Sequence, residues 1–467
     1  MAKEIEPLGI ERFPIRLVIM AKQTKTSLAQ KRVSRKSKYP IAAAIDRFIH
    51  RVRDTSLSAH TFIPLAAQIR KQQSEKLGKE IEKIKVSLEH EPDDSILESK
   101  EIEKTYQTLR MAERISSSKL PQTVERSLFL GLFSAFDVFT GDLISAIYDK
   151  KPELFNSMGK TISVAEILKY SSINDLKKVI LNDKIETFRR NSYVEQFKEL
   201  ESDFDIKLRE FPHWPNFVEC AQRRNILMHS DGIVSEQYLK VCQDEGYKIP
   251  SDLITGTQLK LGAEYFFSSC DLMIEIAVKL GQTLWRKVFP EELEDAESHL
   301  TKVIYDCLER EKWKLTLILG EFSINQKKSG KEINKRIDII NYSIALKYSE
   351  QKDKVRSFLS KYDWSSQVND LKLAEAVMLE DYDKAAEVMI KIGKQGELVT
   401  RTGYHIWPLF REFRATKQFA QAYQKVYDVP FITDLKEATN SVQTQLAEGM
   451  QKDIEGNKFS QTDNSLT

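Results

Sequence analysis

One seven-residue segment, 223–229, carries the side chains best suited to chemistry in this sequence. It begins with Arg223 and Arg224, continues with Asn225, and ends with His229. An arginine binds phosphate through paired hydrogen bonds and keeps its charge at physiological pH. A histidine transfers protons near pH 7. This set of side chains is able to cleave RNA without a metal, because His229 can move a proton and Arg224 can stabilise the negative phosphorane.

The spacing within this segment also predicts how the side chains cooperate. Asn225 lies four positions before His229 and therefore on the same helix face, where it can orient the histidine or the phosphate. Arg224 lies about 140° from His229 around an ideal helix, so one helix does not easily bring both to one phosphate. Two such helices in a symmetric dimer can, and we expect a homodimer or a higher homo-oligomer. Arg223 is expected to bind RNA phosphate or to have a structural role.

The motif resembles the signature of the HEPN ribonuclease superfamily, an arginine followed by four to six residues, the first of them polar, and then a histidine. The resemblance extends to Glu125–Leu130, Asp142–Ile144, Lys151–Leu154 and Ser230–Val234 with Tyr238, over about residues 121–285, and is similar to the RiboL-PSP and MAE types. It implies an active site shared between two motif helices, with Arg224, Asn225 and His229 as catalytic residues. It also implies a toxin or an abortive-infection effector against phage.

One regulatory variant of the family is not expected. In HEPN toxins that a nucleotidyltransferase antitoxin controls, a tyrosine stands two residues after the histidine, whereas this chain has Asp231 there. A second hypothesis is that the bundle binds RNA or protein without cleaving and the rest of the chain is a scaffold.

Other chemistries lack the residues they require. No cluster of histidine, cysteine and carboxylate predicts a metal site, no glycine-rich loop predicts a nucleotide, and no Ser-His-Asp set follows a strand, so we expect neither metal nor cofactor. His213, next to Trp214, and His405, next to Trp407, are expected to be turn or core residues.

Composition indicates an all-α protein. Of 467 residues, 41% are hydrophobic and 30% charged, with only 13 prolines and 17 glycines. The net charge of +2 does not by itself predict a nucleic-acid partner. Four widely separated cysteines are expected to be reduced and packed. The most apolar run, 128–148, is interrupted by Asp137 and Asp142, so a soluble, cytoplasmic protein without membrane contact is expected.

The first 120 residues divide into two parts. Residues 1–60 are expected to form a flexible arm, since 13–45 hold eight basic residues and no acidic one. Its alternatives are a grip on RNA phosphates or an extension upstream of a start at Met20. Residues 61–120 are expected to form a charged helical hairpin, whose stripe of Leu77, Ile81, Ile84 and Leu88 suits packing or dimer contacts.

The remaining chain is expected to form an antiparallel HEPN-type helical bundle, 121–290, and then an α-solenoid-like array of hairpins, 291–442. In the bundle, helices are predicted over 122–149 and 256–288, with a motif helix that begins at Trp214 and ends before Gly232. In the array, Trp313, Lys352, Tyr382 and Phe419 recur at steps of 39, 30 and 37 residues, which resembles tetratricopeptide repeats. Such repeats suit a protein partner or trigger, and residues 443–467 are expected to be disordered.

Overall fold

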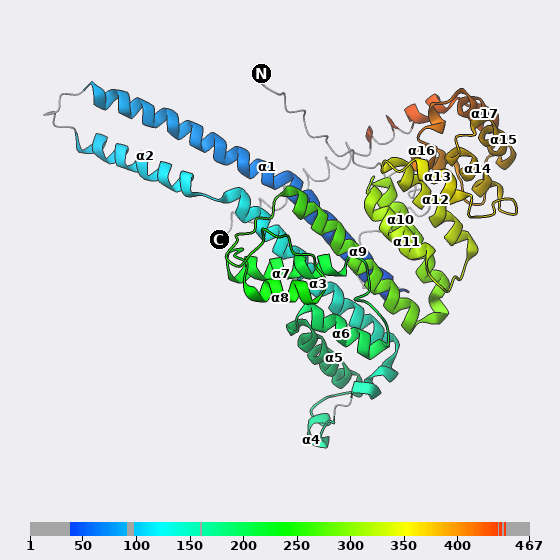
Figure 1. Ribbon diagram of the computed structural model, residues 1–467, viewed down its shortest axis with the longest axis horizontal. Coiled ribbons are helices and arrows are strands. Elements are labelled where there is room, and N and C mark those ends of the chain that lie inside the picture. The colour runs from blue at the N-terminus through cyan, green and yellow to red at the C-terminus, as the bar shows by residue number, and fades with distance from the viewer. Residues whose placement is uncertain (1–37, 91–97, 159–160, 438, 441–442, 445–467) are drawn as a thin grey trace, which may run out of the picture. The chain divides into compact units, whose positions relative to one another are not determined.

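The computed structural model describes residues 38–90, 98–158, 161–437, 439–440 and 443–444 (Figure 1). These residues confirm the all-α class, because they form helices and turns with a single isolated bridge, between Ile233 and Gln258, and no β-strand. They divide into two compact units, and the boundary along the chain falls between Glu292 and Leu293. Of the predicted tail, 443–467, residues 445–467 lie outside the described residues.

The first unit is a bundle around one apolar helix, α3, which packs against α1, α5, α7 and α9. Phe129, Phe133, Phe136 and Phe139 of α3 recur every three or four residues and are fully or almost fully buried. The helices are α1 (Pro40–Glu89), α2 (Ser99–Ser117), α3 (Leu120–Lys150), α4 (Val164–Ile167), α5 (Ile173–Arg190), α6 (Tyr193–Phe204), α7 (Trp214–His229), α8 (Glu236–Asp244) and α9 (Ala263–Val288), with 3-10 turns at η1 (Pro152–Met158) and η2 (Pro290–Glu292).

The predicted arm of residues 1–60 was wrong in its last third. Helix α1 begins at Pro40, a residue whose fixed φ suits the first turn of a helix. Ile41, Ile45, Phe48 and Val52 then follow at steps of three or four and are buried, in the helix that packs on α3 and α9. The prediction of an arm relied on the basic residues upstream and did not take this periodic pattern into account. Residues 1–37 lie outside the described part of the chain.

Helix α3 also explains the most apolar stretch of the sequence. The segment Ser99–Lys150 contains an 18-residue window with a mean hydropathy of 1.5, the only one of its kind in the described residues, and half of that window is buried inside the protein. Its phenylalanines fill the bundle core, as in the central helix of a globular bundle.

The second unit contains three helical hairpins with the same turn, followed by a different ending. Glu311, Glu350 and Glu380 connect the helices of successive hairpins, and each has a positive φ, of 58°, 62° and 62°. They lie 39 and 30 residues apart, the steps that the sequence predicts for Trp313, Lys352 and Tyr382. The residue that directly follows each glutamate donates its backbone N–H to the carbonyl oxygen five residues before it, as Asp381 does to Ala376. The first three predicted hairpins therefore share a backbone conformation.

The fourth predicted hairpin departs from this pattern. Thr416 has a φ of −97° and its hydroxyl caps the following helix by accepting from the Phe419 N–H, so no left-handed residue opens that helix. Whether the array is of the tetratricopeptide type stays a prediction. The helices of this unit are α10 (Leu293–Glu309), α11 (Trp313–Ile324), α12 (Glu332–Tyr348), α13 (Asp353–Leu359), α14 (Asn369–Met378), α15 (Tyr382–Ile392), α16 (Arg401–Ile406) and α17 (Lys417–Tyr427), with 3-10 turns at η3 (Pro408–Phe410) and η4 (Phe413–Ala415).

Candidate active site on helix α7

Helix α7 carries all four predicted site residues, and its two ends are firmly held. At the start, His213 precedes the helix and its Nδ1 lies 2.8 Å from a carboxylate oxygen of buried Glu275, which makes it a structural residue as expected. At the end, the N–H groups of Ser230 and Gly232 donate to the carbonyl of Ile226, at 2.8 and 3.0 Å. Gly232 has a φ of +83°, and a Cβ there would lie 2.8 Å from the Leu259 carbonyl oxygen. Only glycine fits this turn, which ends the helix directly after His229.

Arg223 belongs to a buried network. Its Nε donates to Glu219 at 2.8 Å, and its guanidinium lies 3.8 Å from the centre of the Tyr265 ring. Glu219 also accepts from the hydroxyls of Tyr238, at 2.6 Å, and Tyr265, at 2.7 Å. Burial opposes the charge of Arg223, but its neighbours Tyr265 and Glu219 outweigh this and raise the pKa of Arg223. These contacts favour the structural role over phosphate binding.

Arg224 faces a different set of side chains. It follows Phe217 by seven residues and therefore lies on the same side of α7, and the Phe217 ring packs 5.8 Å from that of Tyr193 in α6. The Tyr193 hydroxyl donates to Asp137 of α3 at 2.8 Å. Burial raises the pKa of Asp137, and the Tyr193 hydroxyl and the charge of Arg224 offset part of the increase. Arg224 is half-buried and donates through Nη1 to Asn225 Oδ1 at 3.0 Å, so two of the predicted site residues are joined to each other.

His229 is the most accessible of the predicted residues. It is exposed at the last position of α7, and within the described residues no hydrogen bond or ion pair involves its ring. Met228 beside it in the chain is 51% exposed and Ile233 is 46% exposed, so two large apolar side chains are exposed near the end of α7. No contact joins Arg224 to His229 within this part of the chain. The structure therefore presents both residues on one helix but does not bring them together in a single copy.

Arg126 was not predicted, and it holds the end of the motif helix. From α3, it donates to the carbonyl oxygen of Leu227 and pairs with Asp231 at 2.6 Å. Asp231 has a φ of 49°, and its carbonyl accepts from the Gln258 side chain at 3.3 Å. Arg126 stands within the segment 125–130 that resembles HEPN proteins, but nothing in the sequence pairs it with a residue 105 positions away. It anchors the turn that follows His229.

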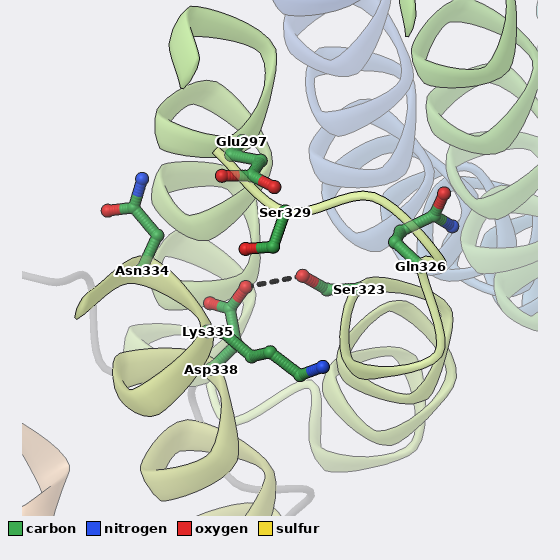
Figure 2. A pocket seen from close by; sticks show the side chains of 7 residues that line it. All are labelled: Glu297, Ser323, Gln326, Ser329, Asn334, Lys335 and Asp338. Atoms are coloured by element: carbon green, nitrogen blue, oxygen red, sulfur yellow. Dashed lines mark hydrogen bonds between the residues drawn. The ribbon is translucent and has the colours of Figure 1, made fainter. Parts of the chain in front are cut away.

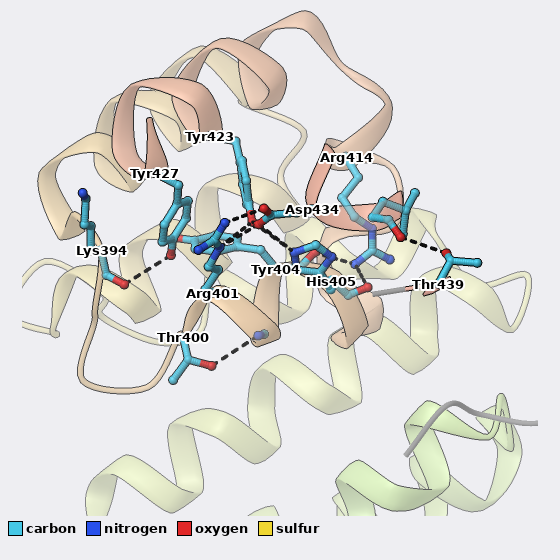
Figure 3. Close-up of polar contacts among 12 residues, drawn as sticks. Lys394, Thr400, Arg401, Tyr404, His405, Arg414, Tyr423, Tyr427, Asp434 and Thr439 are labelled. Atoms are coloured by element: carbon cyan, nitrogen blue, oxygen red, sulfur yellow. Dashed lines mark hydrogen bonds and ion pairs between the residues drawn. The ribbon is translucent and has the colours of Figure 1, made fainter. Parts of the chain in front are cut away.

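A polar cluster in the second unit surrounds His405 (Figure 3). Asp434 accepts from Arg401 Nε at 2.6 Å and from the Tyr423 hydroxyl, and His405 Nε2 lies 3.0 Å from the same hydroxyl. Arg414 donates to the carbonyl oxygens of Tyr404 and His405 at the end of α16. Each of the side chains of Arg401, His405, Tyr423 and Asp434 has at least one partner within the cluster, and burial lowers the pKa of His405. The cluster ties residues 431–437 to α16 and α17, which agrees with the structural role expected for His405.

A small polar cavity lies between α10, α11 and α12 (Figure 2). It measures about 10 Å³ and is lined by Glu297, Ser323 and Asp338 among others. Ser323 donates to Asp338 at 2.5 Å, and Glu297 accepts from the N–H groups of Gly330 and Lys331 at 2.9 Å. This is room for one water molecule and not for a substrate.

The cysteines and acidic residues add no second site. Cys220, Cys242, Cys270 and Cys307 are buried and form no disulfide, as expected. Burial raises the pKa of the Cys220 and Cys242 thiols to about 12, which makes them unreactive at neutral pH. No group of three or more possible metal ligands occurs in the described residues.

Comparison with known proteins identifies no relative: no family model, no curated protein and no solved structure matches this chain.

Proposed function

We propose that this protein is a metal-independent RNA endonuclease of HEPN type, with an active site formed between the α7 helices of two copies. The observation that carries the proposal is the arrangement at the end of α7. His229 is exposed at the last helical position, one turn after the joined pair of Arg224 and Asn225. A proton-transfer group and a cation are thus presented from one rigid helix whose end Arg126 anchors.

The proposed reaction uses the substrate's own 2′-hydroxyl as the nucleophile. A base removes the 2′ proton, the oxygen attacks the adjacent phosphorus, and the bond from phosphorus to the 5′-oxygen breaks. One His229 takes the 2′ proton and the other, His229 of the partner subunit, protonates the leaving oxygen. Arg224 stabilises the charge that develops on the phosphorane, and Asn225 holds the arginine through its Oδ1. The products are a 2′,3′-cyclic phosphate and a free 5′-hydroxyl.

The exposed apolar residues near His229 support dimerisation on this face. Met228 and Ile233 flank the end of α7, and Ile254, which is 64% exposed, belongs to the loop that hydrogen-bonds to residues 232–234. Large apolar side chains exposed close together are typical of a surface that another protein covers. The same contact would set the two α7 helices side by side, which the angular separation of Arg224 and His229 requires.

The proposal includes a biological role. A nuclease of this type would act in the cytoplasm as a toxin or an abortive-infection effector, and the hairpin array of the second unit would bind the protein partner or trigger. The shared turns at Glu311, Glu350 and Glu380 support an array, because repeated hairpins present extended binding surfaces.

The test is cleavage of RNA by the purified full chain in EDTA. We expect 2′,3′-cyclic phosphate ends, and a decrease of roughly 10²–10⁴-fold in R224A and in H229A, the range of a lost acid-base or charge-stabilising group. Arg190 provides a matched control, because its side chain is 80% exposed at the end of α5 and R190A should cleave normally.

Mixing the two inactive variants tests the shared site. A heterodimer of R224A and H229A retains one arginine and one histidine in the common groove, so part of the activity should return. A wild type that neither cleaves RNA nor is toxic when expressed, or one whose activity both variants retain, would refute the nuclease. RNA binding without cleavage would instead support the alternative, a non-catalytic HEPN-fold scaffold.

A further inference from the structure

Helix α2 turns small side chains toward α1 and leaves large apolar ones exposed. The half-buried positions of α2 recur at steps of three and four and are Thr105, Thr108, Ala112 and Ile115. No residue of α2 is fully buried. On a neighbouring face, Ile102, Tyr106 and Leu109 are 42%, 60% and 45% exposed and also follow at steps of four and three. The contact with α1 therefore leaves about half of the surface of this second stripe exposed.

The stripe continues into a groove at the end of the hairpin. The groove measures about 350 Å³ and is lined by Ile81, Ile84 and Leu88 of α1 and by Leu109 of α2. Lys85 and Glu89 also line the groove, and because their side chains are 62% and 60% exposed we call them its edge charges. Because Leu109 belongs to both features, the groove and the stripe with Ile102 and Tyr106 form one surface, which we call the tip surface.

We propose that the tip surface binds a second copy of this chain, tip to tip about a two-fold axis. The charges at its edge favour this occupant. Lys85 and Glu89 lie one helical turn apart, with Nζ and Oε1 at 3.8 Å. In a dimer where Lys85 contacts Glu89 of the partner subunit, two-fold symmetry also sets Glu89 against Lys85 of the partner subunit. The surface then forms two ion pairs with a copy of itself.

The wider charge distribution agrees with a protein partner. Residues 70–89 hold six basic and four acidic side chains, and residues 98–117 hold four basic and four acidic side chains. A surface that binds nucleic acid needs a basic stripe, whereas these charges are mixed along both helices.

The apolar area matches what a dimer of this kind requires. With ~200 Å² for a large apolar side chain, the exposed fractions of Leu88, Ile102, Tyr106 and Leu109 amount to roughly 400 Å² per copy. A standard interface buries about 800 Å² per partner, and a little more than half of that is apolar. Two hairpins joined in this way form a four-helix bundle, in which each amphipathic pair buries the face that it cannot bury alone.

Sedimentation of the full chain tests the contact with a matched pair of variants. Y106E places a charge in the stripe, whereas M111E places the same charge on a residue that is 54% exposed and lies about 140° further around α2. We expect Y106E to have about half the mass of the wild-type assembly and M111E to have the wild-type mass, with unchanged helicity by circular dichroism in both. A monomeric wild type, or an unchanged mass in Y106E, overturns the proposal.

Reversal of the edge charges identifies the occupant. K85E sets two acidic side chains against each other and should weaken self-association by about tenfold or more. The double variant K85E/E89K restores opposite charges across a two-fold axis and should recover wild-type association. A contact with a different protein gives no such recovery, so failure of the double variant also overturns the proposal. H229A keeps the tip surface intact and should keep the wild-type mass, which separates this contact from the proposed nuclease.

Discussion

Two adjacent arginines on α7 provide the sharpest test of the structural reasoning. Arg223 has a side chain that is 12% exposed and pairs with Glu219, which is 4% exposed, whereas Arg224 is half-buried and its hydrogen bond goes to its neighbour Asn225. We therefore expect R223M to destabilise the first unit strongly and R224M to affect stability little. For the proposed RNA cleavage, the order should be reversed.

The expected cost of R223M follows from the contacts of Arg223. Removal of one partner from a buried ion pair costs about 3–5 kcal/mol, and the lower end applies because Tyr238 and Tyr265 still donate to Glu219. Loss of the stacking on Tyr265 adds about 1 kcal/mol, which methionine partly replaces. A total of about 3 kcal/mol corresponds to a decrease of roughly 10 °C in the Tm of a unit of this size. R224M loses a single part-buried hydrogen bond, about 1 kcal/mol or less.

Calorimetry of the full chain and of three variants measures these differences. The third variant, E219Q/R223M, removes both charges and leaves an amide whose oxygen accepts from one tyrosine hydroxyl and whose nitrogen donates to the other, so it should be more stable than R223M alone by about 1 kcal/mol or more. RNA binding measured well below each Tm should be normal in R223M. The reasoning is refuted if R223M is as mild as R224M, or if R223M loses RNA binding while its Tm is unchanged, which would restore the phosphate-binding prediction for Arg223.

Two further predictions concern Arg126 in the first unit and His405 in the second unit. R126M should lower the rate of RNA cleavage while RNA binding persists, because the turn after His229 loses its ion pair to Asp231 and its bond to the Leu227 carbonyl; an unchanged rate would show that Arg126 does not position His229. Burial lowers the pKa of His405 below its unfolded value, so the unfolded chain binds the proton more tightly and stability should fall as pH decreases through about 6.5. The change in the Tm of the second unit between pH 7.5 and pH 5.5 should be smaller in H405Q than in the wild type. Asp434 does not contribute in this range, because its pKa is lowered. An equal change in both proteins contradicts the assignment of the pH dependence to His405.

Local patterns were sufficient to locate most helices. The apolar positions of α3, the Trp-Pro start of α7 and the glycine after it depend only on neighbours in the chain, and the structure has α3 over Leu120–Lys150 against the predicted 122–149. The start of α9 was predicted seven residues early, because residues 256–262 form hydrogen bonds with the turn after α7, as Leu259 does with Gly232, instead of a helix. These hydrogen bonds depend on a partner that is distant in the sequence, so the local pattern does not predict them.

The candidate site divides in the same way. Residue types and spacing along the chain were enough to select Arg224, Asn225 and His229, because acid-base and anion-binding chemistry is a property of side chains and a helix places them at known angles. Tertiary structure alone separated Arg223 from Arg224, since burial of Glu219 between Tyr238 and Tyr265 assigns the first arginine to the core. It also added Arg126, and it showed which apolar side chains of α2 remain exposed. Burial and pairing between distant segments arise only when the helices pack. Periodicity along one helix therefore does not predict them.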